Sequence, residues 1–141
     1  MFDRIAKRYD FMNRLISFGL DKGWRKKLLR QLGPLQAGDR ILDLATGSGD
    51  VAFALRSTLP GDSEVIGLDF CQPMLDQAER KAKERGSPTN LRFLQGDCLN
   101  LSFEDESFDA ITIAFGLRNL EDRARGLTEM HRILRPGGSL L

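Results

Sequence analysis

The stretch RILDLATGSGDVAF, residues 40–53, decides the fold of this protein. Its first part, RILDLA (40–45), is an apolar run typical of a buried strand, and a helix is expected over Asp50–Thr58. A glycine turn, Gly47-Ser48-Gly49, separates the two, and such a turn between a strand and a helix usually holds a ligand. Asp43 stands four residues before Gly47, so the question is which ligand would tolerate a carboxylate there.

The rest of the chain continues this alternation of strand and helix. Strand-like apolar segments recur at 64–69 (EVIGLD), 91–95 (LRFLQ) and 109–116 (DAITIAFG). Further helices are expected at 73–84 and 122–134. Strands that alternate with helices indicate a parallel sheet with right-handed crossovers. The predicted fold class is therefore α/β, a Rossmann-like, doubly wound parallel sheet.

A helical segment precedes the sheet. Residues 2–16 carry apolar side chains at helical spacing with basic residues between them, which predicts an amphipathic helix broken near Asp10. A second helix is expected over 21–32. We therefore divide the chain into an N-terminal helical segment, 1–36, and a sheet domain, 37–141.

The bulk composition limits the function. The chain has 141 residues, a usual size for one domain, and 21 Lys and Arg against 20 Asp and Glu, so its charge favours no nucleic acid. No apolar run approaches the roughly 20 residues that span a bilayer, and the start lacks a secretory signal, so we expect a cytoplasmic protein. Two cysteines without metal or disulfide spacing fit a reducing compartment, and no metal-ligand set is visible. The one histidine, His131, is expected at the surface.

Acidic residues follow the predicted strands at the place where ligands bind in such sheets, beyond the carboxyl ends. Asp43 and the glycine turn follow the first strand, Asp69 the second and Asp97 the third. Asp69 comes 22 positions after Gly47, close to the ~20 expected between a glycine turn and the carboxylate that binds a ribose. An adenosine-containing ligand is therefore expected. Taken singly, each acid has an alternative role as a cap of a turn or helix or as an ordinary loop residue.

Two adenosine-containing ligands compete for this turn. Residues 47–52 satisfy the GxGxxA pattern of nicotinamide cofactors, but Asp43 would repel a pyrophosphate and attract an ammonium. S-adenosylmethionine carries an ammonium and a sulfonium and no phosphate, so it is the cofactor we expect. Its carboxylate would approach the backbone amides of Gly47 and Gly49, with Ser48 donating from within the turn. The residues predicted to hold the remainder are Asp69 for the ribose hydroxyls, Asp97 for the adenine amino group, and Phe70 and Met74 for the faces of the ring.

Several segments together resemble a known family. Similarity to the UbiE/MenG family of quinone-biosynthesis C-methyltransferases lies in MFDRIAKRYDFMNRLISFGLDKGWR, LDLATGSGD, GLDF, ITIAFGLRNLED and EMHRILRPGG. The glycine turn and GLDF alone are typical of any class I methyltransferase. GLRN and the RYDxxN segment are the specific parts, and the resemblance covers essentially the whole chain.

The resemblance implies a class I methyltransferase fold and a reaction. A methyl group would pass from S-adenosylmethionine to a ring carbon of a polyprenylated demethylmenaquinol or of the corresponding ubiquinone precursor. The resemblance also implies cofactor contacts at Ser48, Asp69, and Asp97 with Cys98; Ser48 stands where threonine is commoner. Ala114 matches a position often occupied by serine, so one polar cofactor contact is expected to be missing.

The chemistry of a quinol suggests which further residues act. A hydroquinone becomes a good carbon nucleophile when its hydroxyl loses a proton, so the enzyme must supply position and hold an oxyanion. Arg118 and Asn119, just past the fourth strand, are the candidates for orienting the ring oxygen, with a structural loop pair as the alternative. Tyr9, with Asp10 and Asn13, is expected to close over the substrate. The same segment suits peripheral contact with an anionic bilayer, the alternative being packing against the sheet.

The end of the chain departs from the family. Family members continue beyond the Pro136-Gly137-Gly138 turn, whereas this chain stops at Leu141. The last helix is expected to end at that turn with the next strand barely begun, which would leave the fourth strand as an exposed apolar edge. We therefore expect either a fragment of a longer product or self-association through this edge. Two other functions stay open: a cofactor-binding remnant or interaction module without catalysis, and a nicotinamide-dependent oxidoreductase.

Overall fold

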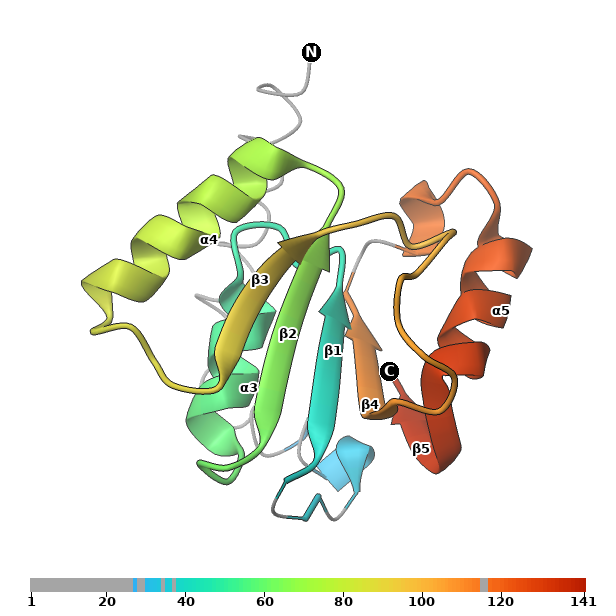
Figure 1. Cartoon of the computed structure of the whole chain (residues 1–141), viewed down its shortest axis with the longest axis horizontal. Coiled ribbons are helices and arrows are strands. Elements are labelled where there is room, and N and C mark those ends of the chain that lie inside the picture. Colours follow the sequence, from blue (N-terminus) through green and yellow to red (C-terminus); the bar gives the residue numbers. More distant parts are fainter. Residues whose placement is uncertain (1–26, 28–29, 34, 37, 115–116) are drawn as a thin grey trace.

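A computed structural model describes residues 27, 30–33, 35–36, 38–114 and 117–141 of the chain. Its centre is a five-stranded sheet with the order β3-β2-β1-β4-β5, in which every neighbouring pair is parallel (Figure 1). The strands are β1 (Arg40–Leu44), β2 (Glu64–Asp69), β3 (Leu91–Gln95), β4 (Phe108–Ile113) and β5 (Leu134–Leu140). The predicted α/β class with a doubly wound parallel sheet is confirmed.

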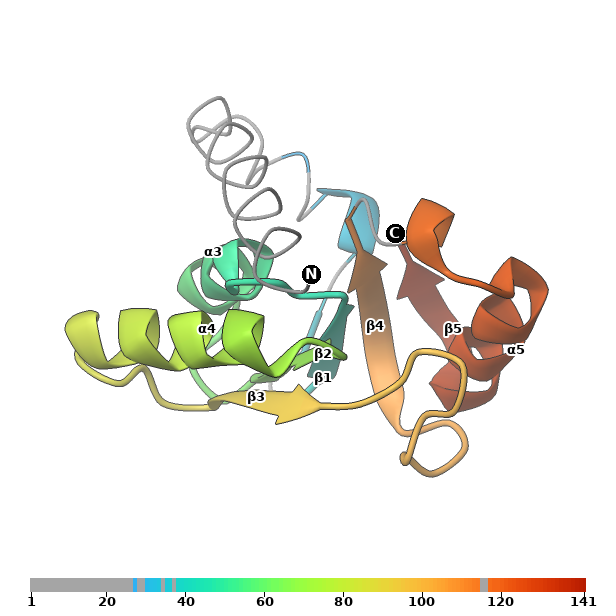
Figure 2. The same ribbon diagram turned by 90° about the horizontal axis from the view of Figure 1, so that it is seen from above.

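The helices lie on both faces of the sheet. Figure 2 shows α3 (Asp50–Thr58) and α4 (Gln72–Glu84) on one face and α5 (Arg123–Ile133) on the other. The start of each helix has a local cause in the sequence. Helix α3 follows Gly49, which adopts the left-handed conformation, and α4 has a proline in its first turn. Helix α5 is capped by the Asp122 carboxylate, which accepts from the amide of Arg125. A short 3-10 helix, η1 (Leu117–Asn119), precedes α5.

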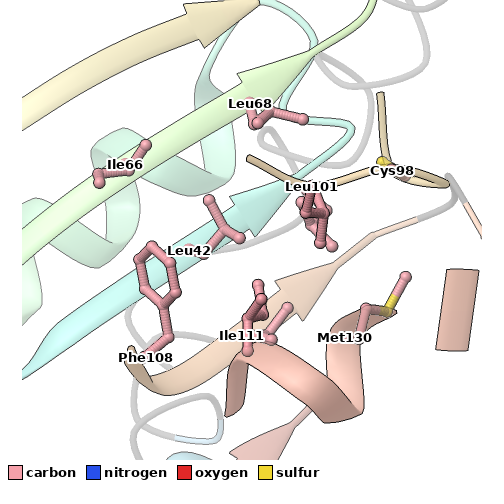
Figure 3. Close-up of a cluster of buried hydrophobic side chains, with 10 residues drawn as sticks. Leu42, Ile66, Leu68, Cys98, Leu101, Phe108, Ile111 and Met130 are labelled. Atoms are coloured by element: carbon pink, nitrogen blue, oxygen red, sulfur yellow. The ribbon is translucent and has the colours of Figure 1, made fainter. Parts of the chain in front are cut away.

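The two faces of the sheet give two hydrophobic cores. Ile41 of β1 belongs to the cluster that contains Leu55 of α3, whereas its neighbour Leu42 belongs to the cluster that contains Met130 of α5. Figure 3 shows the second cluster, with Leu42, Phe108 and Met130 among its members. Because successive side chains of a strand point to opposite faces, a strand covered on both sides must be apolar throughout, as the buried part of β1, ILDL (41–44), is except at Asp43.

The connection between β3 and β4, residues 96–107, contains no helix and is held instead by side chains of α5. Arg132 donates to the carbonyl oxygens of Leu101 and Phe103, at 2.9 and 2.8 Å, and forms an ion pair with Glu129. The Glu129 carboxylate in turn accepts from the amide of Leu101 at 2.8 Å. This network holds in place the loop that carries Asp97 and Cys98.

The prediction that the fourth strand forms an exposed edge of the sheet is wrong. Helix α5 ends at Ile133, and β5 begins at the next residue and pairs with β4 through Ser139 and Leu140. A register shift opposite the 108–110 segment of β4 lets Pro136-Gly137-Gly138 bulge out, so these residues interrupt the ladder without ending it. Strand β4 is therefore an inner strand, which removes the reason we gave for self-association through its edge.

The predicted N-terminal helices fall almost entirely outside the described residues. The division into 1–36 and 37–141 therefore stays a prediction. Leu32 is described and is buried in the α3-side core, and its carbonyl oxygen accepts from the Ser139 hydroxyl at 3.1 Å. No helix within the described ranges is long and apolar enough to cross a membrane.

Candidate functional site at the carboxyl ends of the strands

The turn after β1 adopts a conformation that needs small residues. Ala45, Gly47 and Gly49 have positive φ angles of 52°, 59° and 93°. The amide of Thr46 donates to the carbonyl oxygen of Leu68 at 3.0 Å, which ties the turn to β2. A Cβ atom on Gly49 would lie 2.9 Å from the ring of Phe93 on β3. The turn is thus packed against its neighbours and presents a preformed backbone surface.

Asp43 lies under this turn as a buried carboxyl group. Its side chain is 1% exposed, and its two oxygens accept from the hydroxyls of Thr46 and Thr112, each at 2.7 Å. Desolvation by burial raises the pKa of Asp43 to about 6, although the two hydroxyl donors act to lower it. At pH 7 about nine-tenths of such a group is ionised. Both donors are neutral, so the negative charge of Asp43 is stabilised by the dipoles of two hydroxyl groups.

The sheet provides the space for this buried group. In the strand register Asp43 lies between Gly67 of β2 and Thr112 of β4. A Cβ atom on Gly67 would lie 2.8 Å from the hydroxyl oxygen of Thr46 and equally close to Phe93. Any larger residue at Gly67 would therefore displace the hydroxyl that supports Asp43. Sequence reasoning did not find Gly67 or Thr112, because each meets Asp43 only through strand pairing.

Asp69 joins the turns that follow β1 and β2. Its Oδ2 atom accepts from the amide of Gly47 and its Oδ1 atom from the amide of Cys71, both at 2.8 Å. The charge of Asp69 is also a small cause of the raised pKa of Asp43. The structure thus brings the two predicted acids to one place, the first half of the glycine turn, where they accept from Thr46 and Gly47. A diphosphate there would face two carboxylates.

A lysine of α4 also contacts the turn, and sequence reasoning missed it. The Nζ atom of Lys81 donates to the hydroxyl oxygen of the fully buried Ser48 at 2.8 Å. It also lies 3.3 Å from Oδ1 of Asp50, the first residue of α3. The available signal was the helical spacing of Met74, Ala78 and Lys81, which places all three on one side of α4.

The predicted adenine-binding pair differs in exposure. Phe70 is 64% exposed, so much of its ring lies at the surface. Met74 is only 3% exposed and forms part of the buried face of α4. Stacking of a ring between these two side chains stays a prediction, and Phe70 offers much the larger surface.

The loop after β3 carries the remaining predicted cofactor residues. Asp97 is exposed, and its Oδ1 atom accepts from the amide of Leu99 at 2.9 Å. Cys98 is buried, and desolvation raises the pKa of its thiol to about 11. The amide of Gly96 donates to the carbonyl oxygen of Asp69 at 3.0 Å, so this loop begins beside the second acid.

The predicted substrate residues are only partly described. Ala114 directly follows β4 and is half-buried, and Arg118 and Asn119 form η1 with Leu117. Tyr9, Asp10 and Asn13 lie outside the described residues. His131 is exposed on α5, as predicted. In the described part of the chain no group of three or more His, Cys, Asp or Glu side chains could hold a metal ion.

Comparison with known proteins places this geometry in context. Residues 1–141 match the sequence model of the ubiE/COQ5 methyltransferase family. The chain is 52% identical to a demethylmenaquinone methyltransferase of Thermus thermophilus over its whole length, covering 62% of that protein. It is 43% identical to the ubiquinone/menaquinone biosynthesis C-methyltransferase UbiE of Geotalea daltonii, of which it covers 60%. The chain thus spans less than two thirds of the length of these relatives.

The fold is found in solved structures as well. A crystal structure from Methanococcus maripaludis, assigned as a candidate S-adenosyl-L-methionine-dependent methyltransferase, superposes with a TM-score of 0.85 at 24% identity. The superposition covers 99% of this chain and 64% of the other. At that identity the likeness supports the fold alone.

Proposed function

Because the chain belongs to the ubiE/COQ5 methyltransferase family, we propose that it binds S-adenosylmethionine at the carboxyl ends of β1, β2 and β3. The observation that carries this proposal is the buried carboxyl group of Asp43 beneath the glycine turn. Its two hydrogen-bond donors are uncharged, so a cationic ligand would gain from its charge while a diphosphate would lose. The nicotinamide alternative is disfavoured for the same reason.

The residues at this edge fit the cofactor. The side of the turn nearest Asp43 suits the ammonium of the cofactor. The amides of Gly47 and Gly49 donate to the Asp69 carboxylate and to the carbonyl oxygen of Thr46, so the carboxylate of the cofactor would compete for them. Asp69 keeps a second lone pair on each oxygen after accepting from Gly47 and Cys71, which is the capacity needed to accept from two ribose hydroxyls. The exposed ring of Phe70 and the carboxylate of Asp97 suit an adenine. Bound there, S-adenosylmethionine supplies an electrophilic methyl group on a sulfonium.

We further propose a polyprenylated quinol as the methyl acceptor. The relatives support it through their names, which refer to demethylmenaquinone and to ubiquinone/menaquinone biosynthesis. A quinol carbon attacks well only when a ring hydroxyl is deprotonated, so a site for it must bind an oxyanion. Arg118 and Asn119 are the residues we assign to that task, because η1 follows β4 at the edge where β1 and β2 end. Tyr9 is assigned to the cover over the substrate.

We assign contact with the membrane to the N-terminal segment, 1–36. A prenylated quinol resides in a bilayer, so an enzyme in the cytoplasm must reach it at the inner membrane face. The basic and apolar residues of 2–16 suit peripheral contact with anionic lipid.

The test is incubation of the protein with methyl-labelled S-adenosylmethionine and either a demethylmenaquinol or the benzoquinol precursor of ubiquinone. Label in one extracted lipid is the expected result, and the lipid that gains it identifies the acceptor ring. Cofactor binding by calorimetry without label in either lipid would instead favour a binding module without catalysis. Tight binding of NADH with indifference to S-adenosylmethionine would overturn the proposal.

A further inference from the structure

Lys81 has surroundings that differ from those of Lys83, the other lysine on its helix. Its side chain is 19% exposed, although lysine usually reaches solvent. It continues the buried side of α4, one turn beyond Ala78, whereas Lys83 on the same helix is exposed. Its ammonium ends at the glycine turn, 2.8 Å from the Ser48 hydroxyl oxygen.

The turn therefore has two carboxyl groups at one end and, at the other, the Lys81 ammonium in an ion pair with Asp50. Its first half, Thr46 and Gly47, is bonded to the carboxyl groups of Asp43 and Asp69. Its second half, at Ser48, accepts from the Lys81 ammonium, whose charge is shared with Asp50. An amino acid carries an ammonium and a carboxylate on one carbon, and a turn with one negative and one positive end is complementary to that pair.

From this arrangement we propose that Lys81 is a positioning residue for the amino-acid end of the cofactor. It orients the Ser48 hydroxyl and lends positive charge to the half of the turn that receives the carboxylate. The inference rests on the proposed binding of S-adenosylmethionine and adds a residue that contacts the ligand only through Ser48. It also explains how a turn flanked by two acids accepts a ligand carboxylate.

The experiment compares two ligands that differ in this end and in the charge of the sulfur, which is a sulfonium in S-adenosylmethionine and an uncharged thioether in 5′-methylthioadenosine. S-adenosylmethionine and 5′-methylthioadenosine share the adenosine and the sulfur, but the second lacks the amino-acid group. Their Kd values are measured by calorimetry on the purified chain and on Lys81→Met, which removes the charge but keeps the length of the side chain. Lys83→Met is the matched control on the exposed side of α4. Lys81→Arg tests rescue by charge, and circular dichroism checks that each variant is folded.

We expect Lys81→Met to weaken the binding of S-adenosylmethionine about tenfold, while the Kd of 5′-methylthioadenosine changes less than about twofold. Lys81→Arg should recover part of the loss, and Lys83→Met should match the wild type. Equal weakening of both ligands, or of neither, would assign Lys81 a purely structural role and overturn the inference. If Lys81→Met does not fold, the same comparison on Lys81→Arg and Lys81→Gln decides it. A wild type that binds neither ligand would refute the proposed function itself, and this inference with it.

Discussion

Asp43 of β1 and Thr112 of β4 lie opposite each other in the sheet, and the Thr112 hydroxyl donates to the Asp43 carboxyl group at 2.7 Å. Both side chains are buried. This hydrogen bond therefore contributes to the stability of the sheet and also supports the charge of Asp43 beneath the glycine turn. A buried position that could hold an aliphatic residue holds a carboxyl group instead. Burial of this group lowers the stability of the fold, and the site requires it.

Replacement of Thr112 by valine should destabilise the protein. The variant keeps the shape of the side chain but removes one of two donors to a buried carboxyl group, so we expect the free energy of unfolding to fall by about 1–3 kcal/mol. Urea denaturation at pH 7.5 measures it. Thr128→Val, at an exposed position on α5, is the matched control and should change little. A Thr112→Val protein as stable as the wild type would show that the bond is dispensable.

The pH dependence of stability should reveal the raised pKa of Asp43. Because that pKa rises from 3.8 to about 6 on folding, the stability from this group is fully present below pH 3.8 and is lost as the pH rises through 6. Asp43→Asn cannot titrate. Its stability relative to the wild type should therefore grow between pH 4.5 and 7, by about 2 kcal/mol. Parallel stability curves for the two proteins across this range would contradict the assignment.

A methyl group at Gly49 should disturb the turn for two separable reasons. Gly49→Ala places a side chain at φ 93° and brings Cβ within 2.9 Å of the Phe93 ring. Gly86→Ala has a similar φ of 79° but open space around it, so it reports the backbone cost alone. Thermal unfolding should give a loss of about 1 kcal/mol for Gly86→Ala and clearly more for Gly49→Ala. Equal losses would mean that Phe93 moves aside without cost.

The two cysteines should differ in reactivity. Burial raises the pKa of Cys98 to about 11, so almost none of it is thiolate at pH 8, whereas Cys71 is half-buried at the start of α4. Iodoacetamide should therefore modify Cys71 first and Cys98 only after unfolding, as peptide mass spectrometry of the time course would reveal. Similar rates for the two thiols in the folded protein would show that the loop after β3 opens readily.

Much of the fold was predictable from the sequence because its signals are local. Strand β2 and strand β3 have the predicted limits, and α3 does too, since apolar runs and glycine turns bound them. Strand β5 was missed because Pro136-Gly137-Gly138 reads as an end of structure, whereas a bulge accommodates it beside β4. The formation of β5 depends on pairing with β4 and cannot be read from the sequence of residues 134–140 alone.

The site was predictable in part for the same reason. Asp43 and Asp69 lie at the carboxyl ends of their strands, so their convergence at one edge could be expected from topology. Thr112 is 69 positions from Asp43 and Lys81 is 33 from Ser48, and no periodicity along the chain links such pairs. The burial of Asp43 was also not foreseen, since it depends on Gly67 and Thr112 on the two adjacent strands.

The central claim, that Asp43 selects a cationic ligand over a diphosphate, is tested most directly by calorimetry at pH 7.5. S-adenosylmethionine and NADH are titrated separately into the wild-type chain and into Asp43→Asn. We predict that the wild type binds S-adenosylmethionine and no measurable NADH, and that Asp43→Asn loses about tenfold or more in affinity for S-adenosylmethionine. Tighter binding of NADH than of S-adenosylmethionine, or an unchanged Kd in Asp43→Asn, would contradict the account.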